Sequence, residues 1–386
     1  MRRSAGRILT THIGSLARPK DLLEMMDARL HGKPYDQEAY VKRVASAVTE
    51  VVHKQVECGV DIITDGEQGK ASFNAYVAER LTGFEPVAHS AERIAARMKS
   101  QEAQAFPEYY EKYFAEHMCG VGPNDQLVCT GPVVYAGQSA VRADIENLKL
   151  ALRGLNPEEV FMPAIAPGFW SNRYYRSDEE FQYALGEALR TEYLAIVDAG
   201  FILQIDDPSL TRLYRTEPSL SLAERSKDAG IYIEALNHAL RGIAPERIRY
   251  HTCYGINEGP RVFDIPLQDI VGLMLKVNAG AYSFEAANAR HAHEWRVWED
   301  VKLAEGKILI PGVITHASNI VEHPVLIAER IANYAKLVGR ENVIGGADCG
   351  FSSQATFTPE VHPSVVWAKF RALAEGARLA SKKLWH

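Results

Sequence analysis

The run Ile248-Arg249-Tyr250-His251-Thr252-Cys253-Tyr254-Gly255 has a form that recurs along the chain. It is a short apolar segment that ends in polar residues and is followed by a long helical pattern. Eight further runs of this form occur, at residues 8–15, 60–67, 127–132, 160–167, 201–208, 280–285, 308–314 and 343–350. Short apolar runs that alternate with amphipathic helices are typical of a parallel β-sheet.

The position of the polar residues within these runs favours one parallel architecture. They fall at the carboxyl ends of the expected strands, where a (β/α)8 TIM barrel places its active site. We therefore expect a single barrel domain over residues 1–386, with a helical insertion at about 84–125. The spacing of apolar residues also predicts helix from Asp21 to Gln55. Nine runs compete for eight strand positions, and a doubly wound open sheet is the alternative.

Composition excludes several classes of protein. The 386 residues are 47% hydrophobic and 24% charged, with a net charge of -6, which disfavours both a disordered chain and a nucleic-acid partner. The sequence has no apolar stretch of the ~18 residues that a membrane-spanning helix requires. Five scattered cysteines are not a disulfide framework. These features favour a reduced, cytoplasmic enzyme.

The most informative residues are His251 and Cys253. Residues two apart on a strand face the same side, so both side chains are expected at the barrel mouth. Glu285 and Cys349 end two later runs. Imidazole, thiolate and carboxylate are all zinc ligands, and together these four residues predict a tetrahedral Zn2+ site.

The chain also resembles a known family over nearly its whole length. It resembles the C-terminal, catalytic half of cobalamin-independent methionine synthase and its short, single-barrel relatives. The motifs that carry the resemblance are Thr10-Thr11-His12-Ile13-Gly14-Ser15, Asp65-Gly66-Glu67, Gln204-Ile205-Asp206-Asp207-Pro208, His251-Thr252-Cys253, Ser283-Phe284-Glu285 and Asp348-Cys349-Gly350.

The resemblance implies roles for individual residues. It assigns zinc binding to His251, Cys253, Glu285 and Cys349. It assigns binding of the amino-acid part of homocysteine to Gly14, Ser15, Glu67 and Asp206. It also places His316 near a histidine that would protonate the leaving group, although the local spacing here differs by one residue from methionine synthase proper.

The implied chemistry is alkyl transfer to a thiol. Zinc coordination removes the thiol proton and leaves a nucleophilic thiolate. Glu285 binds zinc less firmly than cysteine, so we expect it to yield its place to the substrate. The partners are then a small-molecule thiol and an alkyl donor, and the aromatic insertion suggests a homo-oligomer.

Two other functions stay open at this point. One is alkylation of coenzyme M or another thiol, because residues 264–298 and 311–350 resemble the branch that contains the epoxyalkane:coenzyme M transferases. The other is a zinc- and thiol-binding barrel without catalysis. Glu67 and Asp206 favour a thiol that carries an amino group, because carboxylates repel a sulfonate. Methyl transfer from 5-methyltetrahydrofolate to homocysteine is the favoured activity.

The remaining motif residues have weaker signals. Asp348 either orients a ligand from behind or closes a turn. His291 and His293 lie in an expected active-site loop. Cys58, Cys119 and Cys129 have no partner at motif spacing and are expected to be core or surface residues.

Overall fold

A computed structural model describes residues 1–88, 95, 97–117, 120–123, 125–168, 170–211, 222–255 and 258–386. Eight strands form one parallel sheet in the order β1-β11-β10-β9-β8-β7-β5-β2. A parallel bridge between Thr11 and Ile62 joins the two edges, which closes the sheet into a barrel. The strands are β1 (Leu9–Thr10), β2 (Ile62–Ile63), β5 (Glu159–Ile165), β7 (Ile202–Asp207), β8 (Ile248–Thr252), β9 (Ala281–Phe284), β10 (Ile308–Ile314) and β11 (Ile344–Ala347).

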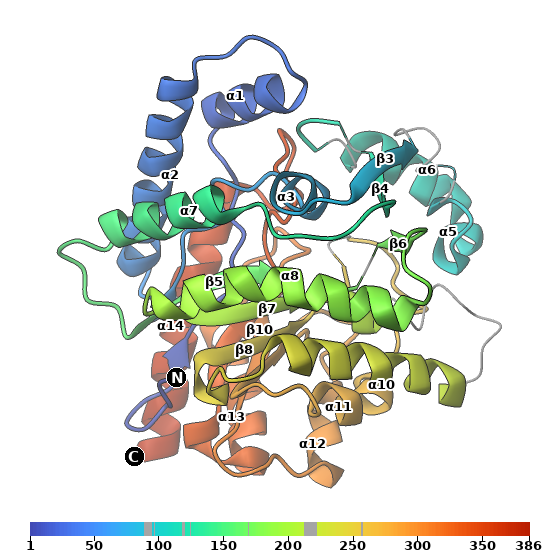
Figure 1. Cartoon of the computed structure of the whole chain (residues 1–386). Coiled ribbons are helices and arrows are strands. Elements are labelled where there is room, and N and C mark those ends of the chain that lie inside the picture. Colours follow the sequence, from blue (N-terminus) through green and yellow to red (C-terminus); the bar gives the residue numbers. More distant parts are fainter. Residues whose placement is uncertain are drawn as a thin grey trace.

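Helices follow the strands and cover the outside of the barrel (Figure 1). They are α1 (Lys20–Leu30), α2 (Gln37–Glu57), α3 (Phe73–Arg80), α7 (Gln138–Ala151), α8 (Asp178–Asp198), α10 (Leu222–Ala239), α11 (Leu267–Met274), α12 (Val297–Asp300), α13 (Pro324–Val338) and α14 (Pro363–Trp385). Three short 3-10 helices accompany them, η1 (Pro245–Arg247), η2 (Glu294–Arg296) and η3 (Arg340–Asn342). The prediction of a (β/α)8 TIM barrel is confirmed.

Local sequence explains where several of these helices begin. The Asp36 side chain accepts a hydrogen bond from the backbone N–H of Ala39 and caps α2. Ser177 caps α8 in the same way, and Pro363 occupies the first position of α14, where no backbone donor is needed. The helix expected over Asp21–Gln55 is two helices, α1 and α2.

The ninth apolar run lies outside the barrel. Residues 127–132 contribute to β4 (Gln126–Cys129), which pairs antiparallel with β3 (Phe84–Ala88) and parallel with β6 (Ser171–Asn172). Strand β3 begins the insertion, and α5 (Gln101–Ala105) and α6 (Pro107–His117) lie between β3 and β4 in the chain. The insertion is thus not wholly helical, because residues 84–88 find a strand partner in β4. Residues 89–94, 96 and 118–119, with Cys119, fall outside the described part of the chain.

The hydrophobic core of the described residues has three clusters, one of which is a small cluster within α5 and α6 of the insertion. Apolar residues of the strands fill the lower barrel, among them Leu9, Phe161 and Ile310, while a larger cluster joins the sheet to its helices. Arg249 is fully buried inside the barrel and donates hydrogen bonds to the Thr11 hydroxyl and the His12 carbonyl. Among the described residues, no helix is both long and apolar enough to cross a membrane.

Candidate active site

Three predicted ligands meet at the carboxyl ends of β8 and β11. Ligand atoms of His251, Cys253 and Cys349 all lie within 4.8 Å of one another, and all three residues are buried. The Cys253 and Cys349 sulfur atoms are 3.4 Å apart. Neither ring nitrogen of His251 has a hydrogen-bond partner, which is costly for a buried polar group unless another ligand satisfies it. The arrangement fits a metal ion of borderline softness such as Zn2+.

Glu285 belongs to a second group instead. Its carboxylate lies within 4.8 Å of ligand atoms of His316 and Cys349, so Cys349 is common to both groups. Glu285 Oε2 forms a 2.7 Å ion pair with Arg261 and accepts a 2.9 Å hydrogen bond from Asn288. Oε1 is buried without a hydrogen-bond partner. The structure thus brings Glu285 to the edge of the metal group with one oxygen held and the other available.

The charges of the two cysteines differ. The hydrogen bond with Cys349, and then the nearby His251, hold the pKa of Cys253 well below its usual value. The same hydrogen bond, together with burial, raises the pKa of Cys349. A thiolate at Cys253 beside an imidazole is a good starting point for binding a cation. Burial lowers the pKa of His316 to about 4, so this histidine is neutral near pH 7.

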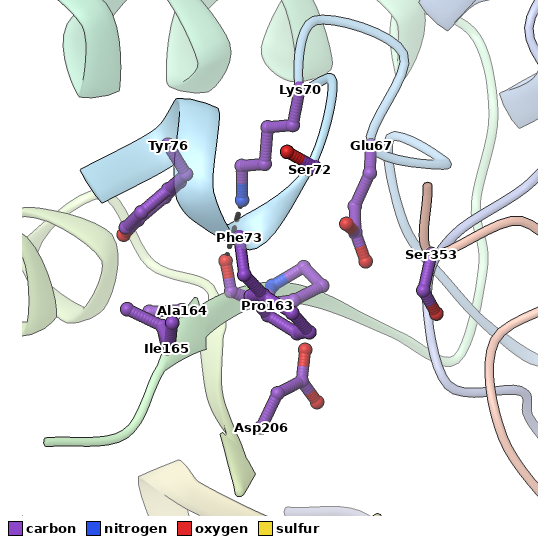
Figure 2. A pocket seen from close by; sticks show the side chains of 10 residues that line it. All are labelled: Glu67, Lys70, Ser72, Phe73, Tyr76, Pro163, Ala164, Ile165, Asp206 and Ser353. Carbon is purple, nitrogen blue, oxygen red and sulfur yellow. Dashed lines mark hydrogen bonds between the residues drawn. The ribbon is translucent and has the colours of Figure 1, made fainter. Parts of the chain in front are cut away.

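A second part of the site is a small pocket with a cavity volume of about 20 Å³ (Figure 2). Glu67 and Asp206 both line it, together with Lys70, Pro163 and Ser353. Burial raises the pKa of Asp206 to about 8, and the nearby Glu67 carboxylate adds to this rise; burial also raises the pKa of Glu67. Asp206 is buried and Glu67 is half-buried, and two carboxyl groups in one pocket can attract a cationic ligand, which would relieve their repulsion.

The segment Ile13-Gly14-Ser15 forms one wall of this region. Gly14 has a φ of 138°, and a Cβ atom there would lie 2.8 Å from Glu67 Oε1, so only glycine fits. Gln204 donates hydrogen bonds to the Ile13 carbonyl and to Asp206 Oδ1. Ser15 Oγ lies 3.3 Å from Ser353 Oγ. The predicted substrate residues therefore lie together.

The pocket and the metal group are neighbours because of strand register. Asp206 on β7 pairs directly with His251 on β8. The carboxyl group of Asp206 and the His–Cys–Cys group thus come from neighbouring strands, which lie about 4.8 Å apart.

Several site residues had no role assigned from the sequence. Arg261 and Lys70 lie in loops whose contacts only the fold reveals, while Gln204 belongs to a quoted motif and faces the same side as Asp206 because it lies two residues before it. Asp348 orients the loop after β9, since its carboxylate accepts hydrogen bonds from the backbone N–H groups of Ala286, Ala287 and Asn288. His291 is held by Asp264 and Glu294 and belongs to neither metal group.

These features define a (β/α)8 barrel with a thiol- and imidazole-lined site at its carboxyl-terminal mouth. Residues 8–153 match the family model described as "Cobalamin-independent synthase, Catalytic domain". The chain is therefore similar to the cobalamin-independent methionine synthases, and the resemblance predicted from its motifs is confirmed.

Curated proteins show the same similarity at low identity. A methionine synthase of Sulfolobus acidocaldarius is 25% identical over 247 residues, which cover 64% of this chain and 61% of the relative. The matches to that protein and to its Saccharolobus solfataricus counterpart span about three fifths of those proteins. A methionine synthase of Saccharolobus islandicus is 24% identical over 379 residues, covering 97% of this chain and 95% of the relative.

Solved structures share the fold. A B12-independent methionine synthase from a Shewanella species superposes with a TM-score of 0.71 at 18% identity, covering 98% of this chain and 99% of the other. A putative vitamin-B12 independent methionine synthase from Listeria monocytogenes gives a TM-score of 0.66 at 18% identity, covering 96% and 98% of the two chains.

Proposed function

We propose that this chain is a zinc-dependent alkyltransferase that methylates the thiol of homocysteine. One observation carries the proposal: a buried His–Cys–Cys group lies one strand away from a pocket lined by the carboxyl groups of Glu67 and Asp206. Such a site can hold a thiol at one end and the amino group of the same molecule at the other. The names of the relatives, which are methionine synthases, support the same activity.

The donor set supports zinc as the cofactor. His251, Cys253 and Cys349 would supply three ligands, and Glu285 a fourth that can be displaced. The partnerless His251 nitrogens and Glu285 Oε1 are the atoms that such an ion would satisfy. When bound, zinc would lower the pKa of the substrate thiol and keep the thiolate nucleophilic.

The chain's own residues would bind and orient the substrate. Glu67 and Asp206 would bind the amino group, while Gly14 and Ser15 would contact the remaining amino-acid atoms. His316 is neutral at rest, so we propose that it accepts the thiol proton and passes it to the leaving group. The C–S bond then forms as the bond between the alkyl group and the donor breaks, and the proton taken from the thiol ends on the leaving group.

Reduced thiols are needed for this chemistry. The four cysteines in the described part of the chain are all free. We therefore propose a cytoplasmic location, where cellular reductants keep thiols reduced.

The test is an assay of the purified, zinc-loaded chain with homocysteine or coenzyme M as acceptor. Methyl-folate, methylcobalamin and an epoxide are offered as donors, and the S-alkyl product is measured. We expect methionine from homocysteine, and no product from the Cys253→Ser variant. Product only from coenzyme M and an epoxide would establish the transferase alternative. Zinc and thiol binding without any product would establish a non-catalytic barrel.

A further inference from the structure

Arg261 lies at the edge of the metal group in an unusual backbone conformation. Its φ is 56°, and Glu67 is the only other non-glycine residue with a positive φ in the described ranges. Side chains other than glycine adopt this conformation at a cost in energy, and such residues concentrate at functional sites. Arg261 is only 8% exposed although it is charged. Both features call for a specific role.

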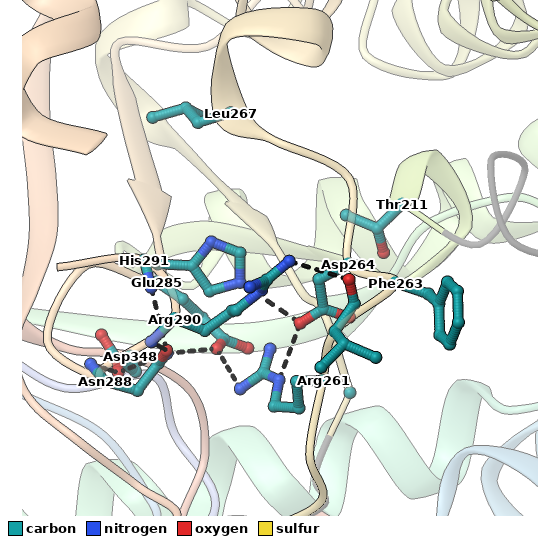
Figure 3. A network of polar contacts seen from close by, with 12 residues as sticks. Thr211, Arg261, Phe263, Asp264, Leu267, Glu285, Asn288, Arg290, His291 and Asp348 are labelled. Atoms are coloured by element: carbon teal, nitrogen blue, oxygen red, sulfur yellow. Dashed lines mark hydrogen bonds and ion pairs between the residues drawn. The ribbon is translucent and has the colours of Figure 1, made fainter. Parts of the chain in front are cut away.

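The contacts of Arg261 connect it to two carboxylates (Figure 3). Nη1 forms the 2.7 Å ion pair with Glu285 Oε2, and Nε donates a 2.7 Å hydrogen bond to Asp264. Asp264 in turn contacts His291 at 3.2 Å, and His291 contacts Glu294 at 2.8 Å. The contacts from Asp264 to His291 and Glu294 do not involve Glu285. Asp264 would therefore still hold Arg261 if Glu285 moved.

The two oxygens of Glu285 therefore have different roles. Arg261 and Asn288 hold Oε2, whereas Oε1 has no hydrogen-bond partner and is the atom available to a metal. The ion pair with Arg261 and the hydrogen bond from Asn288 withdraw charge from the carboxylate and weaken it as a ligand. The same ion pair gives the displaced carboxylate a buried partner, without which it would carry an uncompensated charge.

We infer that Arg261 is a positioning residue that holds Glu285 and so determines how readily Glu285 gives up its ligand position to an incoming thiol. The inference rests on the proposed zinc-dependent function. Arg261 would act through Glu285, because its ion pair and hydrogen bond are to Glu285 and Asp264 and not to the His–Cys–Cys group.

The test measures binding instead of turnover. Arg261→Met removes the charge and roughly keeps the side-chain volume, and Arg261→Lys restores the charge. Arg290→Met is the matched control, because Arg290 is exposed on the neighbouring loop and donates to the Val262 carbonyl. Homocysteine affinity is measured by calorimetry on the zinc-loaded proteins. The absorption of the Co2+-substituted proteins reports the ligand set with and without homocysteine.

We expect Arg261→Met to weaken homocysteine binding about tenfold, in line with the effect of residues behind metal ligands. Arg261→Lys should recover part of the loss, and Arg290→Met should bind like wild type. In a Glu285→Ala background the effect of Arg261→Met should vanish, because the carboxylate it controls is gone. The Co2+ spectrum of Arg261→Met should change less on homocysteine addition than that of wild type.

Two results would overturn the inference. One is wild-type homocysteine affinity in Arg261→Met, and the other is an equal loss with and without Glu285. If Arg261→Met does not fold, Arg261→Lys carries the same comparison. A wild-type chain that binds neither zinc nor homocysteine would overturn the proposed function as well, whereas normal wild-type binding with no variant effect would overturn the inference alone.

Discussion

Under the proposed function, the carboxyl groups of Glu67 and Asp206 would determine which thiol the site accepts. Asp206 is buried and linked to the Ile13 carbonyl through Gln204, so it cannot turn away from the pocket without breaking that link. A thiol with an amino group gains from these carboxylates, whereas a sulfonate is repelled by them.

The first prediction concerns Asp206→Asn. A hydrogen bond to a buried charged group contributes roughly 1.5–3 kcal/mol, so the variant should bind homocysteine about 10- to 100-fold more weakly. The affinity for 3-mercaptopropionate, which has no amino group, should be unchanged. Calorimetry with both thiols checks this. An equal loss for the two thiols would contradict a role of Asp206 in amino-group binding.

The second prediction concerns the glycine opposite Asp348. A Cβ atom at Gly312 would lie 2.0 Å from Asp348 Oδ1 and 2.7 Å from the Asp348 Cα. Gly312→Ala should therefore displace Asp348 and destabilise the protein by about 1–3 kcal/mol, as overpacking does. The control is Gly345→Ala on the neighbouring strand, where the nearest atom is 3.4 Å away. Urea unfolding measures both, and equal stability of the two variants would contradict the prediction.

The elements of the barrel were predictable because each strand carries its own pattern. The pattern of residues 248–255 predicts a buried strand followed by polar residues at the mouth. The structure places β8 there, with His251 and Cys253 near its end. The ninth run could not be rejected in this way. Residues 127–132 are as apolar as a barrel strand, and only their pairing with β3 and β6 sets them apart.

Loops were predictable only where a motif marks them. The ligand role of Glu285 was inferred from a motif, but its neighbour Arg261 comes from the loop after β8, 24 positions earlier by the numbering. Nothing local in the sequence predicts the positive φ of Arg261, whose side chain contacts Glu285 and Asp264 in the folded chain. Tertiary contacts of this kind override local preference.

The third prediction concerns His291, which joins Asp264, in the loop before α11, to Glu294 in η2. Burial alone would lower the pKa of His291, but hydrogen bonds with Asp264 and Glu294 raise it to about 9. A pKa raised above the unfolded value stabilises the folded state fully below about pH 6.5, and this stabilisation is lost as the pH rises through 9. The stability advantage of wild type over His291→Gln should therefore shrink by up to about 3 kcal/mol over that range.

Chemical unfolding of wild type and His291→Gln at about pH 6 and about pH 9.5 measures this difference. His293→Gln is a suitable control, because it changes a neighbouring imidazole outside the Asp264–Glu294 link. A stability difference that stays constant with pH would contradict the charged state assigned to His291.

At the scale of the whole molecule, the barrel separates its stability from its site. The closed eight-stranded sheet and its apolar layers lie below the mouth, and the predicted ligands Cys253, Glu285 and Cys349 come from segments that follow strand ends. The fold therefore does not need a metal to bury its core. Zinc, if bound at the mouth, adds stability only through its affinity for the folded state.

The last prediction follows from this separation. Chelation should leave the chain folded, with unchanged far-ultraviolet circular dichroism, but should lower its thermal midpoint. Zinc at about 1,000 times its Kd should restore about 4 kcal/mol of stability, since a ligand that binds only the folded state stabilises it by mass action. The Cys253→Ser, Cys349→Ser double variant should unfold at one temperature with or without zinc. Unfolding of the wild type on chelation would show that the barrel depends on the metal, and a zinc-dependent midpoint in the double variant would show that the ion binds elsewhere.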